Sequence, residues 1–170
     1  MSCDESLAAV KLVASSAWAN NLVYGGFSDW RLPTLNPLDA SCTGFAVGVG
    51  FNCTGSELSR LFVTDLGNQG SSSVLNQVGD TAEQIANLAL FSNVQSFDYW
   101  SGTEYAPDPA LVWDFNTNGG NQSLDVKFNA LYAVAVRPGD VAASVPEPQT
   151  LALALLALGA TMVVRRRRPV

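Results

Sequence analysis

The spacing of apolar residues changes near residue 97 and divides the chain into a helical part and a strand-rich part. Before that point, apolar residues recur mostly at helical spacing over residues 6–24 and 56–66, and glycines follow both runs. Residues 81–91 are compatible with a short helix or with irregular structure. The intervening residues 32–53 and 68–80 are rich in Pro, Gly and polar side chains, so we expect loops there.

Beyond residue 97, short runs of aromatic and β-branched residues alternate with turn residues. This pattern predicts an antiparallel meander with strands at residues 99–103, 110–116, 123–129 and 132–137. Helices followed by a meander indicate an α+β fold. About 140 residues ahead of the C-terminal tail are enough for one domain with its own core.

The C-terminal tail has three consecutive parts. Val145-Pro146-Glu147-Pro148 cannot continue a helix or strand and marks an exposed joint. The uncharged apolar run 151–164 predicts a hydrophobic helix. With Gln149 and Thr150 included it spans roughly 24 Å, which is short of a bilayer core of ~30 Å. A buried helix is the alternative, but Arg165, Arg166, Arg167 and Arg168 favour a membrane segment whose basic end stays in the cytoplasm.

In this order, the tetrapeptide, the apolar run and the arginines resemble the PEP-CTERM sorting signal. The resemblance implies export, a transient inner-membrane intermediate with the domain outside the cytoplasm, and processing by an exosortase. The cell surface or the extracellular polysaccharide matrix is then the destination. We expect the segments to be a domain at 1–140, a linker at 141–150, a transmembrane-like helix at 151–164 and a basic cytoplasmic tail at 165–170.

Residues 1–16 do not resemble an export signal, because Asp4 and Glu5 stand where a basic start is expected. We therefore expect the true start, and with it the signal, to lie upstream of Met1.

Charge disfavours two classes of binding partner, and the cysteine content indicates a disulfide. Ahead of the terminal arginines, five Lys and Arg face fifteen Asp and Glu, a balance of −10 that disfavours nucleic acid and anionic membrane surfaces. Cys42 and Cys53 bracket a Gly-rich stretch, and in an exported chain we expect them to form a disulfide that stabilises the fold by ~3 kcal/mol. Cys3 is then the odd cysteine.

Five strings in the domain resemble the Lcl C-terminal domain family. They are Trp-Ala-Asn-Asn-Leu at 18–22, Gly-Gly-Phe-Ser-Asp-Trp-Arg-Leu-Pro-Thr at 25–34, Tyr-Trp-Ser-Gly-Thr at 99–103, Ala-Leu-Val-Trp-Asp-Phe at 110–115 and Ala-Val-Ala-Val-Arg at 133–137. The resemblance implies a C-type-lectin-like or formylglycine-generating-enzyme-like fold, with two or more short helices, a small twisted antiparallel sheet and long irregular loops. It assigns no biochemical activity.

Catalysis is disfavoured. The chain has no histidine, which excludes Ser-His-Asp and Cys-His machinery and most zinc sites. Formylglycine-generating enzymes hold copper with a cysteine pair, whereas residues 95–137 contain no cysteine, so that activity does not carry over.

The aromatic and arginine motifs have structural interpretations. We expect Asp29, Trp30 and Arg31 to form a corner in which Trp30 is buried and Arg31 pairs with a carboxylate; the alternative is a sugar-stacking aromatic beside a bidentate arginine. Trp100 and Trp113 lie in strand-like runs and are expected in the core. The candidate partners of Arg137 are Asp29, Asp98 and Asp114.

One constellation matches the spacing of a calcium loop. Asp114, Asn116, Asn118, Gly119 and Asp125 occupy its first, third, fifth, sixth and twelfth positions. The flanking residues alternate like strands, and Asn, Gly and Asp are also the residues of β-hairpin turns, so a turn is favoured and a calcium site is the alternative. No other cofactor is expected.

Two functional hypotheses follow. The first is a non-catalytic carbohydrate or matrix binding module that uses loop aromatics and the amides of Asn116, Asn118 and Asn121. The second is a structural surface or biofilm protein without a specific ligand. A third hypothesis, which the sequence supports less than these two, is a divergent formylglycine-generating-like enzyme.

Overall fold

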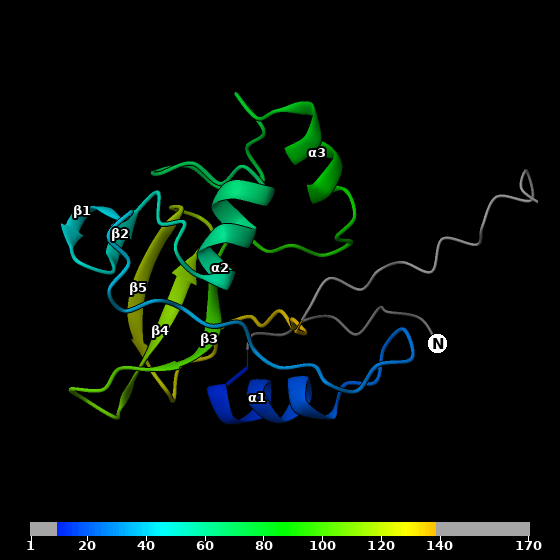
Figure 1. Cartoon of the computed structure of the whole chain (residues 1–170), viewed down its shortest axis with the longest axis vertical. Coiled ribbons are helices and arrows are strands. Elements are labelled where there is room, and N and C mark those ends of the chain that lie inside the picture. Colours follow the sequence, from blue (N-terminus) through cyan, green and yellow to red (C-terminus); the bar gives the residue numbers. More distant parts are fainter. Residues whose placement is uncertain (1–9, 139–170) are drawn as a thin grey trace, which may run out of the picture. The chain divides into compact units, whose positions relative to one another are not determined.

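The computed structural model describes residues 10–138 and has an α+β fold (Figure 1). Five strands form one antiparallel sheet in the order β1-β2-β5-β4-β3. The strands are β1 (Thr43–Ala46), β2 (Val49–Phe51), β3 (Asp98–Glu104), β4 (Leu111–Asn116) and β5 (Asn121–Val126). The predicted C-terminal helix at 151–164 lies outside the described residues.

The three long strands confirm the predicted meander, but the predicted loop at 32–53 is wrong in part. It contains the β1–β2 hairpin, which extends the sheet because Phe51 of β2 pairs with Asn121 of β5. Three glycines in this hairpin have positive φ angles, including Gly48, whose Cβ would lie 2.2 Å from the Pro37 carbonyl oxygen. Gly in a strand normally argues against a strand, which is why the sequence pattern concealed the hairpin.

The fourth predicted strand, 132–137, is also wrong. Instead of a continuous ladder, this segment makes two single bridges, from Tyr132 to Tyr99 and from Val136 to Arg31, and Leu131 just before it bridges to Val10. Its alternating apolar side chains are therefore explained by burial along an extended connection rather than by a strand of the sheet. The segment covers one edge of β3, since Trp100 N–H donates to the Tyr132 carbonyl at 2.9 Å.

The predicted helices form, with shorter bounds. The first is α1 (Leu12–Asn21). The second begins as α2 (Glu57–Ser59) and continues as η1 (Arg60–Asp65), a π-helical stretch that ends with a bond from Leu66 N–H to the Leu61 carbonyl at 3.0 Å. Residues 81–91, which the sequence left open, contain α3 (Ala82–Leu88), whose first turn is fixed by a capping box between Thr81 and Gln84.

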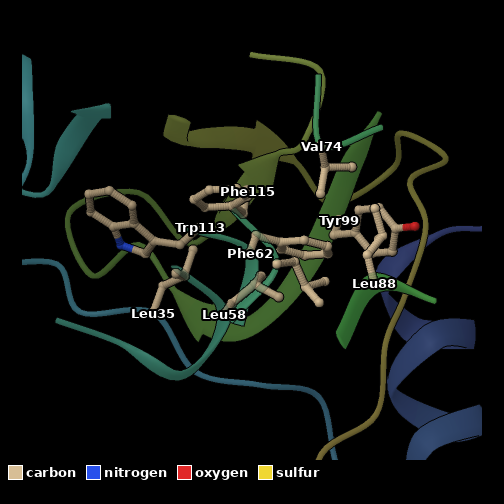
Figure 2. Packing of buried hydrophobic residues seen from close by; sticks show 9 residues of the cluster. Leu35, Leu58, Phe62, Val74, Leu88, Tyr99, Trp113 and Phe115 are labelled. Atoms are coloured by element: carbon tan, nitrogen blue, oxygen red, sulfur yellow. The ribbon is translucent and has the colours of Figure 1, made fainter. Parts of the chain in front are cut away.

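The two faces of the sheet are covered differently. On one face, aromatic side chains of β3 and β4 pack against α2 and η1, and Figure 2 shows Phe62 beside Tyr99 and Phe115. The rings of Phe62 and Phe115 are stacked at 5.4 Å. On the other face, Trp100 and Val112 pack against Leu12 and Ala19 of α1. That second core covers one part of its face, and the remaining part carries polar residues.

Candidate functional site

The polar part of the second sheet face holds three carboxyl groups from three neighbouring strands. Strand register places Asp98 opposite Asn116 and Asp114 opposite Ser123. Asp125 follows two residues after Ser123, so its side chain lies on the same face. We call this set the acidic face: Asp98, Asp114, Asn116, Ser123 and Asp125.

Asp114 lies at the centre of the acidic face and is 1% exposed. Burial raises its pKa to about 8, and the negative charges of Asp98 and Asp125 add to this effect. The Ser123 hydroxyl acts in the opposite direction, because it donates to the two carboxylate oxygens of Asp114 at 2.9 and 3.0 Å. At neutral pH, Asp114 therefore retains a proton.

Asp98 and Asp114 are hydrogen-bonded to each other and titrate as a pair. Burial raises the pKa of Asp98, and the hydrogen bonds from Asn116 and Asp114 limit the rise. Because the same bond raises the pKa of Asp114 and lowers that of Asp98, we place the shared proton on Asp114, which donates it to Asp98. The pair thus carries one negative charge where two would repel.

Asp125 borders this pair from β5. Its Oδ1 accepts the Asn129 side-chain N–H at 2.7 Å and the Val126 backbone N–H at 2.6 Å. Within residues 10–138, the three ion pairs of the structure involve other carboxylates, so the acidic face has no Lys or Arg partner there. This arrangement can accommodate a proton or a cation that replaces it.

The proposed calcium-loop residues separate into two groups. Asn116 and Asn118 serve the β4–β5 turn: Asn116 Oδ1 accepts Gly119 N–H at 2.6 Å, and Asn118 Oδ1 accepts the Ser96 hydroxyl at 3.0 Å. Gly120 has a positive φ of 66°, as a tight hairpin requires. The predicted hairpin turn is therefore present at residues 117–120, while Asp114 and Asp125 lie on the strands in the acidic face.

Sequence reasoning missed Asp98 as a partner of Asp114. The signal was its position two residues before Trp100, which places both side chains on one face of a strand. The pairing of β3 with β4 then brings it to Asp114, and that register was not readable from the sequence. The oxygen-only donor set suits a hard cation such as calcium.

A second cluster contains Cys42, Cys53 and Asp39. The two cysteines form a disulfide, and the ligand atoms of the three residues lie within 4.8 Å of one another, the one such acid and thiol group in the described part of the chain. Burial opposes ionisation of Asp39, but hydrogen bonds from Ser41, Gly55 and Thr54 outweigh it and lower its pKa. With both sulfurs bonded to each other and the carboxylate fully hydrogen-bonded, this cluster is structural.

The ligand oxygens of Asp98, Asp114 and Asp125 do not all lie within 4.8 Å of one another, unlike the ligand atoms of the Cys42, Cys53 and Asp39 cluster.

The arginine motifs are structural. Arg31 binds Glu57 bidentately at 2.7 and 2.6 Å, and Glu57 also accepts the backbone N–H and hydroxyl of Thr34 at 2.9 Å each. This pairing with Arg31 lowers the pKa of Glu57 to about 2, against the opposing effect of burial. Trp30 is half-buried and not buried as predicted, and it donates from Nε1 to the Phe27 carbonyl at 3.2 Å. Arg31 therefore pairs with a carboxylate, as the predicted corner requires, and it is not available to a ligand.

The remaining candidates also have structural partners. Of the three candidate partners of Arg137, Asp29 binds it, with Nε–Oδ1 at 2.9 Å and Nη2–Oδ2 at 3.0 Å. Trp100 and Trp113 are both buried, and Trp100 donates from Nε1 to the Val10 carbonyl at 2.8 Å. Neither tryptophan presents a ring to a ligand.

The sorting-motif residues Val145–Pro148 and Arg165–Arg168 lie outside the described residues, as does the apolar run 151–164. Among residues 10–138, no helix has the length and apolar character that crossing a membrane requires.

Comparison with known proteins gives two family matches. Residues 1–137 match the Lcl C-terminal domain, and residues 144–168 match the PEP-CTERM protein-sorting motif. No curated protein and no solved structure matches the chain. The sorting motif marks an exported protein that an exosortase processes and that is sorted through a membrane-anchored stage to the cell surface. The first match covers most of the chain, and the chain therefore belongs to the Lcl C-terminal domain family.

Proposed function

We propose that the domain is a non-catalytic binding module of the cell surface or extracellular matrix, and that its ligand-binding surface is the acidic face. The observation that carries this proposal is the burial of Asp114. A carboxyl group in a sheet interior destabilises the fold relative to an apolar side chain of similar size. Strongly shifted buried carboxyl groups outside an ion-pair network are typical of functional sites.

The ligand we propose is an extracellular polysaccharide, bridged by calcium. A negatively charged site repels anionic sugars directly, whereas a calcium ion held by Asp98, Asp114 and Asp125 offers open coordination positions to hydroxyl or carboxylate oxygens. Calcium would take the place of the shared proton, so its binding releases a proton and strengthens as pH rises. The amides of Asn116 and Asn121 border this surface from the same face.

We propose no catalytic role. General acid–base chemistry needs a carboxyl beside a bound substrate, and the Asp98–Asp114 proton is held inside the sheet between two protein groups. A C-type-lectin-like architecture is part of the same proposal: a small antiparallel sheet with helices on both faces, and an irregular loop region from 68 to 80 next to the β4–β5 turn, suit a module that binds through one end of its sheet.

The test is calcium titration of the protein at pH 7.5, followed by thermal unfolding with calcium and with chelator. We expect calcium to raise the melting temperature and to permit binding to neutral and acidic polysaccharides on a glycan array. Asp114→Ala should remove both effects. Glu83→Gln, which removes an exposed carboxylate of α3, is the matched control and should change neither.

Two other results would reject parts of the proposal. Polysaccharide binding that is equal with chelator would remove calcium from it. Flat binding across all glycans, with or without calcium, would favour a structural surface or biofilm protein that has no specific ligand.

A further inference from the structure

The turn after α1 presents exposed apolar and aromatic side chains to solvent. Val23 is 72% exposed and Tyr24 is 59% exposed, and Trp18 on α1 is 39% exposed. Tyr24 and Phe27 form a backbone bridge around Gly25-Gly26, with both N–H···O distances 3.0 Å. We call residues 18–30 the aromatic turn.

The aromatic turn is held rigidly. The Tyr24 ring meets the Trp30 ring edge-on at 6.1 Å, and the Trp30 indole donates to the Phe27 carbonyl. Two positive-φ glycines, Gly25 and Gly26, allow the reversal. The exposed side chains are therefore presented on a fixed hairpin, so little conformational freedom is lost when they contact another surface.

The same turn is locked to the point where the chain leaves the domain. The Arg137 guanidinium lies 3.6 Å from the centre of the Phe27 ring and binds the Asp29 carboxylate through two hydrogen bonds. Pro138 is the next residue. The tether between Pro138 and the apolar run is residues 139–150, and 12 residues reach about 40 Å at most.

The aromatic turn carries little charge, a property that it shares with the uncharged stretch 40–56 of the β1–β2 hairpin. Residues 12–28 contain no charged side chain, although the domain is strongly acidic overall. Asp29, the one charged residue among residues 18–30, is paired with Arg137. An uncharged surface with exposed Val, Tyr and Trp is suited to the headgroup region of a bilayer, where amphipathic aromatic side chains are favoured and acidic surfaces are repelled.

We infer that the aromatic turn docks on the membrane surface while the sorting tail is inserted in the membrane. The occupant of this surface is the lipid headgroup interface. The short tether holds the domain at high local concentration next to the bilayer, so a small contact is sufficient. Docking would hold the end of the domain, and with it the start of the tether that carries Val145–Pro148, close to the membrane where the sorting enzyme acts. This inference rests on the membrane-anchored stage of sorting, not on polysaccharide binding.

Quenching of tryptophan fluorescence by brominated lipid tests the inference with the full chain in phosphatidylcholine nanodiscs. The four tryptophans all lie in the domain, so insertion of the tail alone gives no signal. Trp100 and Trp113 are buried in the core, which leaves Trp18 and Trp30 as reporters of contact. We expect brominated lipid to quench the wild-type chain.

The deciding variants change equally exposed residues at two places. Val23→Ser with Tyr24→Ser should reduce the quenching by at least about half. Phe45→Ser with Val47→Ser is the matched control, because these side chains are 70% and 65% exposed on the β1–β2 hairpin, and it should leave the quenching unchanged.

Three results would overturn the inference: no quenching of the wild-type chain, equal quenching in the Val23/Tyr24 variant, or an equal loss in the hairpin control. Loss of glycan binding in the Val23/Tyr24 variant with unchanged quenching would also overturn it, and would assign the turn to sugars. Failure of the calcium and glycan tests would leave this result unaffected, so the two proposals fail separately.

Discussion

The two faces of the sheet differ in the side chains that they bury. One face buries Tyr99, Trp113 and Phe115 against α2 and η1, as the hydrophobic effect favours. The other face buries Asp114 beside Asp98, where apolar side chains would be more stable. Both faces belong to the same three strands, so the backbone does not account for the difference. Apolar side chains on both faces maintain the fold, since Trp100 and Val112 are buried on the second face as well. The buried carboxyl group has no such role, and it is the part of the sheet that we propose serves binding.

The largest effect is expected on the apolar face. Phe115→Ala removes a fully buried ring that stacks on Phe62 and should lower the free energy of unfolding by about 3–5 kcal/mol. Urea unfolding followed by circular dichroism measures this. Phe45→Ala on the exposed hairpin is the control and should cost less than about 1 kcal/mol. If both variants lost the same free energy of unfolding, Phe115 would not belong to the core.

The next prediction concerns the acidic face, where replacing Asp114 should raise the free energy of unfolding instead of lowering it. The folded-state pKa of Asp114 is raised to about 8 from an ordinary value of 3.8, so its contribution to stability is present below pH 3.8 and is lost as pH rises through about 8. Without calcium, Asp114→Asn should therefore stabilise the protein at pH 8, by about 1–3 kcal/mol, and much less at pH 4.

The measurement for Asp114→Asn is urea unfolding at pH 4, 6 and 8 in the presence of chelator. Glu83→Gln should follow the wild-type pH profile. Destabilisation of the Asn variant at pH 8 would show that the charged carboxylate supports the fold, and the contrast between the faces would then disappear.

The smallest effect comes from the donor beside Asp114. Ser123→Ala removes the hydroxyl that hydrogen-bonds both carboxylate oxygens, and it should cost about 1 kcal/mol at pH 8, where Asp114 is ionised for part of the time. At pH 5 the protonated carboxyl depends less on this donor, so the cost should be smaller. Thermal unfolding at the two pH values provides the comparison, and a cost that does not change with pH would mean that Ser123 does not act through Asp114.

Several features followed from local sequence alone. The VPEP tetrapeptide, the apolar run and the four arginines identified the sorting motif, because such a signal is read as a linear string. The helices at α1 and α2 and the strands β3, β4 and β5 followed from periodicity, since each element buries one side of its own short segment. The strings around Trp30 and Trp100 indicated the family.

Tertiary structure decided the rest. The β1–β2 hairpin depends on pairing with β5, about 70 residues away, and glycine-rich composition hid it. The role of residues 132–137 depends on two separate bridge partners, Tyr99 and Arg31. Most of all, the acidic face depends on strand register: Asp98 and Asp114 are 16 positions apart in sequence, and only the β3–β4 ladder brings their carboxyl groups together. Periodicity reports which side of an element is apolar, but burial, pKa and shared protons depend on neighbours that are distant in the sequence.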